Sequence, residues 1–134
     1  MNDFWQRRLL IVAAGWNVLG GSSALFDPTR HFAQLFTESL YLYDPLQAFF
    51  FRCTWINVIA WGAAYLLAAL WPGARMAVLL AGGAGKVAYF GASIALYSHG
   101  AGKTMLLAAG VVDLALAALF AVALLSGRRP VAVR

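Results

Sequence analysis

The sequence predicts an all-α integral membrane protein, a bundle of four transmembrane helices with a short amphipathic surface helix between the first and the second. Of the 134 residues, 63% are hydrophobic and 11% are charged, whereas an ordinary soluble domain carries about 25% charged residues. The apolar residues fall into four stretches, each close to the ~20 residues that a helix needs to cross a bilayer. We therefore expect a single four-helix domain over residues 1–134.

The four spans are predicted at residues 9–26, 46–71, 76–98 and 104–126. Pro72-Gly73 separates the second span from the third, and a glycine-rich turn at residues 99–102 separates the third from the fourth. Turns this short make consecutive helices antiparallel neighbours. The first stretch follows two arginines, as a signal peptide would, but Asn17 interrupts its apolar run, so we interpret it as a retained first helix.

The connection from residue 27 to residue 45 has a helical pattern of its own. Asp27-Pro28 is typical of a helix start, with aspartate as the cap and proline at the first position. Apolar side chains then recur at helical spacing, at Phe32, Leu35, Phe36, Leu40 and Tyr43. The pattern predicts an amphipathic helix over residues 28–43 that lies at the membrane surface and ends at Asp44-Pro45.

The positions of the basic residues predict how the chain is oriented in the membrane. Because the number of spans is even, both termini lie on one side. The other side carries only Arg30 and Lys103, whereas the side of the termini carries Arg7, Arg8, Arg75, Arg128, Arg129 and Arg134. Since basic residues are enriched on the cytoplasmic side, we expect both termini in the cytoplasm. The net charge of +5 reflects this clustering at helix ends and not a nucleic-acid-binding surface.

The third span carries one charge, Lys86, near its middle. A lysine at that depth in a bilayer is costly and needs a partner. Lys86 lies roughly 15 Å from the cytoplasmic end of its span, and Asp113 roughly 14 Å from the outer end of the fourth span, at about 1.5 Å per residue. In a bilayer core about 30 Å thick these depths nearly coincide. The sequence therefore predicts an ion pair between Lys86 and Asp113.

Further polar residues lie at related depths. Tyr89 and Ser93 continue the face of Lys86, while Asn17 and Asn57 lie near the middle of the first and second spans. Arg52 is roughly two turns from the outer end of its span, close enough for its side chain to reach the interface. The candidate ligand-binding residues are Lys86, Asp113, Arg52, Asn17, Asn57, Tyr89 and Ser93.

Three interpretations of this polar group are open. Its members can fix which helices pack together, line a cavity for a ligand or substrate, or form a proton or ion pathway, for which one lysine and one carboxylate make a poor relay. Cys53 is the only cysteine, so no internal disulfide can form, and we expect it to pack as a small apolar side chain within a span. His31 and His99 lack metal-ligand spacing. No metal site is predicted, and no motif identifies a cofactor.

Three short segments resemble a known family. They are Trp16-Asn17-x-x-Gly20-Gly21 in the first span, Gly85-Lys86 in the third and Asp113-Leu114 in the fourth. Together with the hydropathy pattern over the whole length, they resemble the small bacterial four-helix membrane proteins grouped as DoxX-like. The resemblance implies a multi-pass protein of the bacterial cytoplasmic (inner) membrane. Members named for function resemble subunits of a thiosulfate–quinone oxidoreductase or helpers of redox enzymes at the membrane.

Two classes of function follow from the residues and the resemblance. The first is a non-catalytic integral membrane protein. It would be an accessory subunit of a larger membrane complex or a homo-oligomer, or it would bind a lipophilic ligand such as a quinone or lipid-like molecule. The second is a membrane enzyme acting on a lipophilic substrate by redox or acid/base chemistry, with Lys86 and Asp113 as acid/base groups and Arg52 as an anion anchor. A small transporter would need an oligomer, because four helices leave little lumen.

Overall fold

The computed structural model describes residues 3–127, which form five α-helices and one short 3-10 turn. The elements are α1 (Asp3–Phe26), α2 (Pro28–Leu35), α3 (Pro45–Leu70), η1 (Pro72–Ala74), α4 (Arg75–Ser98) and α5 (Thr104–Gly127). Four of these helices, α1, α3, α4 and α5, are long and apolar enough to cross a membrane. They match the four predicted spans, and α1 begins six residues earlier than expected. Arg128, Arg129 and Arg134 lie outside the described residues.

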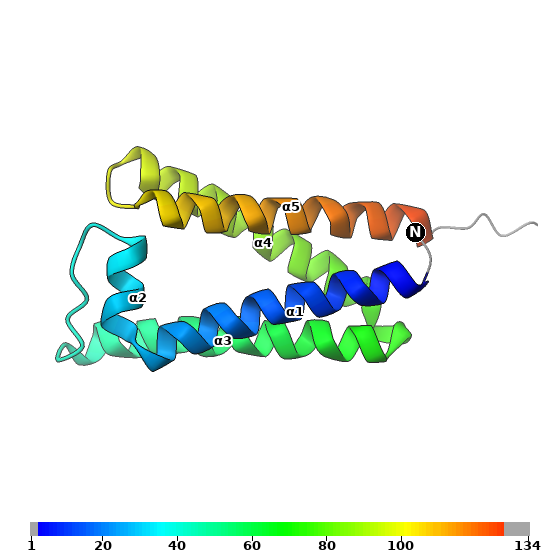
Figure 1. The fold of residues 1–134 in the computed structure, drawn as a ribbon, viewed down its shortest axis with the longest axis horizontal. Coiled ribbons are helices and arrows are strands. Elements are labelled where there is room, and N and C mark those ends of the chain that lie inside the picture. The colour runs from blue at the N-terminus through cyan, green and yellow to red at the C-terminus, as the bar shows by residue number, and fades with distance from the viewer. Residues whose placement is uncertain (1–2, 128–134) are drawn as a thin grey trace, which may run out of the picture.

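The long helices alternate in direction, so that α1 begins and α5 ends at the same end of the bundle (Figure 1). Local capping explains where two of the helices begin. The Asp27 carboxylate accepts a hydrogen bond from the backbone N–H of Arg30 at 3.1 Å. The Asp44 carboxylate accepts two, from the N–H groups of Leu46 at 2.8 Å and Gln47 at 3.2 Å. Each aspartate precedes a proline at the first helical position, as predicted.

The helix predicted over residues 28–43 is shorter than expected. It ends at Leu35, and Phe36 already has an extended backbone, so Leu40 and Tyr43 lie outside it. The reason is a backbone pairing with the α4–α5 turn. The N–H of Thr37 donates to the carbonyl of Ala101 at 3.0 Å, and the N–H of Lys103 donates to the carbonyl of Leu35 at 2.8 Å. These long-range bonds replace the helical ones, and they fasten α2 to the far end of α4 and α5.

The four long helices associate as two pairs. In Figure 1, α1 lies beside α3 and α4 lies beside α5, and these are the two most extensive helix contacts. Glycines allow the close approach of α1 to α3. A Cβ atom at position 21 would lie 2.6 Å from Cγ1 of Ile59, and one at position 62 would lie 2.7 Å from Cγ2 of Val18. Although the short turn joins α3 to α4, these neighbours in sequence contact each other far less than either contacts its partner.

The two pairs meet in a core near the end where α1 begins. Tyr65 of α3 and Phe120 of α5, which are 2% and 1% exposed, pack with their ring centroids 5.4 Å apart. Buried residues from all four long helices surround them: Leu10, Ala13, Ala14, Ala68, Ala69, Leu79, Leu116 and Ala123. At the start of α4, next to this core, the buried Arg75 guanidinium donates to the carbonyls of Ala68 at 3.0 Å and Ala69 at 3.2 Å. It also pairs with Asp3 of α1.

Candidate functional site

The predicted ion pair between Lys86 and Asp113 is confirmed. Lys86, halfway along α4, forms a salt bridge with Asp113 of α5, and only 5% and 13% of the two side chains are exposed. The turn between the helices and the equal depth of the two residues bring them together, as the sequence predicts. Because burying either charge alone is costly, the pair favours this register of α4 against α5.

Two residues of α1 complete the group around the pair. The Lys86 ammonium donates to the Asn17 Oδ1 at 3.2 Å, and the Trp16 Nε1–H donates to the Asp113 Oδ1 at 3.1 Å. Asn17 in turn donates from Nδ2 to the carbonyl of Val58 on α3 at 3.2 Å. We call Trp16, Asn17, Lys86 and Asp113 the polar centre. Its hydrogen bonds connect both helix pairs.

Tyr65 also lies beside the polar centre. The Lys86 Nζ is 5.7 Å from the centroid of the Tyr65 ring, within the range of a cation–π contact. Gly82 makes room for this ring, because a Cβ atom at position 82 would lie 2.6 Å from Cε1 of Tyr65. Our sequence reasoning missed Tyr65 and any role for the Trp16 indole. The signals present in the sequence were Tyr65, a tyrosine within an apolar span, and Gly82, which precedes Lys86 by four residues.

The polar stripe beyond Lys86 packs against α5. Ser93 is 1% exposed, and its hydroxyl donates to the carbonyl of Tyr89 at 2.8 Å. Across the interface, a Cβ atom at position 110 would lie 3.1 Å from the Ser93 Oγ, so the glycine there is what allows the contact. Tyr89 itself is half-buried. Ser93 therefore packs against the neighbouring helix α5, which agrees with the interpretation that the polar group fixes which helices pack together.

Arg52 and Asn57 do not join the polar centre. Both are exposed on α3, and within residues 3–127 no hydrogen bond or ion pair connects either of them to Lys86 or Asp113. Cys53 lies within a candidate span, as expected, but this free cysteine is exposed on the helix surface and is not packed against another helix of the protein. The reason is that α3 uses the opposite side, which carries Phe51 and Gly62, to pack against α1 and α2.

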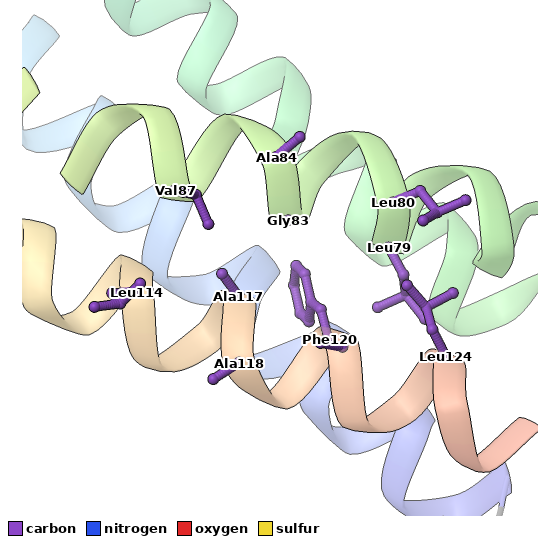
Figure 2. A pocket seen from close by; sticks show the side chains of 11 residues that line it. Leu79, Leu80, Gly83, Ala84, Val87, Leu114, Ala117, Ala118, Phe120 and Leu124 are labelled. Carbon is purple, nitrogen blue, oxygen red and sulfur yellow. The ribbon is translucent and has the colours of Figure 1, made fainter. Parts of the chain in front are cut away.

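An apolar groove runs between α4 and α5 (Figure 2). It has a volume of about 360 Å³, and its walls include Leu80, Gly83, Val87, Leu114, Ala117 and Phe120. Gly83 lies one turn before Lys86, and Ala117 lies one turn after Asp113, so the groove begins about one turn from the ion pair. A second pocket of about 330 Å³ shares Leu79, Leu80 and Leu124 with the groove and extends it to Gln6 and Arg75.

His31 and His99 lie at the end of the bundle that carries α2, and they differ in environment. The His31 Nδ1 is 3.2 Å from the Ser23 hydroxyl, and its ring packs edge-on against Trp55 with centroids 4.5 Å apart. Burial lowers the pKa of His31 below its usual value of 6.5. His99 is exposed in the α4–α5 turn. Among residues 3–127, no group of three or more His, Cys, Asp or Glu side chains is placed to hold a metal ion.

The fold and the site define an all-helical protein with four long apolar helices around a buried ion pair. Comparisons with protein-family models, with curated proteins and with solved structures found no match. The resemblance to DoxX-like proteins therefore stays a prediction, and the function has to be inferred from the geometry of this site.

Proposed function

We propose that this chain is a non-catalytic integral membrane protein that binds one lipophilic molecule, a quinone or a lipid-like amphiphile, in the groove between α4 and α5. The groove carries the proposal. Its volume of about 360 Å³ and its lining of Leu, Val, Ala, Gly and Phe side chains suit a hydrocarbon or prenyl chain. Apolar side chains offer such a chain contact without a charge to desolvate.

Insertion in a membrane is supported by the outer surface of the bundle. Large apolar side chains are exposed along every long helix, among them Leu19, which is 74% exposed, and Leu125, which is 67% exposed. Soluble monomers rarely expose large contiguous apolar patches, so lipid is the natural cover for this surface. We place the protein in the bacterial cytoplasmic membrane on its resemblance to DoxX-like proteins, and both termini in the cytoplasm on the bias of Arg and Lys.

The second pocket supports an orientation for the bound molecule. Its polar lining comes from Gln6 and Arg75, at the end where α1 begins. Gln6 donates to the carbonyl of Ala123, and Arg75 donates to Ala68, Ala69 and Asp3, but each side chain has a further N–H. A polar head group at this end accepts hydrogen bonds from these remaining donors, and the attached chain follows the groove toward Val87 and Leu114. In the proposed topology, the head lies near the cytoplasmic surface and the chain extends toward the middle of the bilayer.

In this proposal the polar centre has a structural role and holds α1 against α4 and α5. The Lys86 charge is neutralised by Asp113, and both side chains are engaged with residues of α1. In an acid/base enzyme, Lys86 and Asp113 would have to lie within reach of a substrate. Arg52, the predicted anion anchor of that enzyme, is exposed on α3 and lies apart from this pair. The geometry therefore favours the binding role over the catalytic alternative. An accessory role in a larger membrane complex is compatible with it.

The test compares phenylalanine substitutions at two alanine positions of the same helix. Ala118 lines the groove and Ala115 does not, and both are exposed on α5. Each protein is purified in mild detergent. The lipids and quinones that remain bound are then extracted and identified by mass spectrometry. We expect one amphiphile to be retained by the wild type and by Ala115→Phe and lost from Ala118→Phe. Equal retention by both variants would exclude this groove as the binding site.

A further inference from the structure

Asn57 lies at the midpoint of a long apolar helix with its side chain exposed. In the 26-residue helix α3, it lies 12 residues after Pro45 and 13 residues before Leu70. Within residues 3–127 no hydrogen bond involves its side-chain amide. If α3 spans the bilayer, as the proposed function requires, this amide lies at the middle of the hydrocarbon core. An amide without a partner in such a medium costs several kcal/mol according to transfer scales.

We propose that two copies of this chain associate through the exposed face of α3, with the Asn57 amide of one copy bonded to the Asn57 amide of the other. An asparagine side chain both donates and accepts, so it is its own complement across a twofold axis. Asparagine is one of the residues that join transmembrane helices through interhelical hydrogen bonds. Because both copies share one orientation in the membrane, the axis lies along the membrane normal and pairs each position with itself.

The neighbours of Asn57 on the same face permit this approach. Cys53 lies one turn before it and Ala60 one turn after it, both exposed, and Ala64 follows one turn later. These side chains are small and uncharged, so two α3 helices can come close without desolvating a charge. Among residues 3–127 the face at Cys53, Asn57 and Ala60 is left exposed, since α3 packs against α1 through Gly62 on its other side. A second copy of this chain presents the same amide and the same small side chains, so it complements this face.

Cys53 provides a direct test, because it is the only cysteine in the chain and lies one turn from Asn57 on the proposed interface. In native membranes, oxidation with copper phenanthroline is expected to give a disulfide-linked dimer on a non-reducing gel. The matched control is Cys53→Ala combined with Val122→Cys, which places the thiol at a site on α5 that is 51% exposed. We expect no crosslinked dimer from the control.

The second variant is Asn57→Leu, examined with Cys53 in place. We expect association about three- to thirtyfold weaker, the range for one polar contact between helices in a membrane, and an unchanged stability of the monomer, since the amide bonds nothing within it. Equal crosslinking from position 53 and position 122, or unchanged association in Asn57→Leu, would overturn the proposal. The result is independent of the α4–α5 groove. Release of the protein from membranes by alkaline carbonate would instead reject membrane insertion, on which both proposals rest.

Discussion

The Asp113 carboxylate of α5 accepts through a single oxygen, Oδ1, from the Lys86 ammonium of α4 and from the Trp16 indole of α1, the latter at 3.1 Å. One acceptor therefore connects the α4–α5 pair to α1, and contacts between the two helix pairs are far fewer than those within each pair. The pairing favours the register of α4 against α5 in which Gly83 and Ala117 line the groove.

Removing either partner of the ion pair should destabilise the protein. We expect Lys86→Met and Asp113→Leu each to lower the free energy of unfolding, because the remaining charge is left buried without a counterion. The loss is about 3–5 kcal/mol in a protein interior and nearer ~0.6 kcal/mol for an average polar contact in a membrane. The measurement is SDS- or heat-induced unfolding in mild detergent.

The double variant is the control for this prediction. Lys86→Met with Asp113→Leu should recover part of the loss, since no unpaired charge remains. Strictly additive losses would show that the two residues are not energetically coupled. If the pair is only structural, the double variant should also retain the amphiphile bound by the wild type.

Two neighbouring glycines of α1 should respond in opposite ways to alanine. A Cβ atom at position 21 would lie 2.6 Å from Ile59 and 3.0 Å from the carbonyl of Trp55, whereas nothing lies within 4 Å of one at position 20. We expect Gly21→Ala to cost about 1–3 kcal/mol through overpacking. Gly20→Ala should leave stability equal or raise it by up to about 1 kcal/mol, because alanine favours the helix. Equal thermal unfolding of the two variants would contradict the close α1–α3 contact.

Acidification should loosen α2. Burial lowers the pKa of His31 below 6.5, so the folded state holds fewer protons than the unfolded state in this window. The stability that neutral His31 contributes is complete above pH 6.5 and is lost as the pH falls through the lowered folded-state pKa. Protonation is costly because the buried Nε2 has no hydrogen-bond partner among residues 3–127.

The pH effect is measured by hydrogen exchange of α2 amides at pH 7.5 and 5.5, after correction for the intrinsic rate. Protection should fall at the lower pH in the wild type and in His99→Gln, since His99 is exposed. His31→Gln should remove the difference. Identical pH dependence in all three proteins would assign the effect to another group.

The topology predicted from the basic residues is tested with introduced thiols. In a Cys53→Ala background, a membrane-impermeant reagent applied outside the cell should label a cysteine at Gln34, which is exposed on α2, and should miss one at Gly127. Both positions should react after the membrane is opened. The reverse pattern in intact cells would place the termini outside.

Properties that depend on a short stretch of chain could be predicted from the sequence. Apolar length set the four spans, and the Asp-Pro pairs at 27–28 and 44–45 set where α2 and α3 begin. The pairing of Lys86 with Asp113 was also predictable, because a short turn and a constant rise per residue convert sequence distance into depth.

The tertiary structure alone decided which helices form pairs and which polar side chains meet. The α1–α3 pairing depends on Gly21 and Gly62 meeting side chains some forty residues away, and the length of α2 depends on backbone bonds to the α4–α5 turn. The same packing turns Asn57 outward and brings Trp16 to Asp113. Hydropathy describes how apolar a helix is, but it contains almost no information on side-chain shape, which determines which helix face is buried.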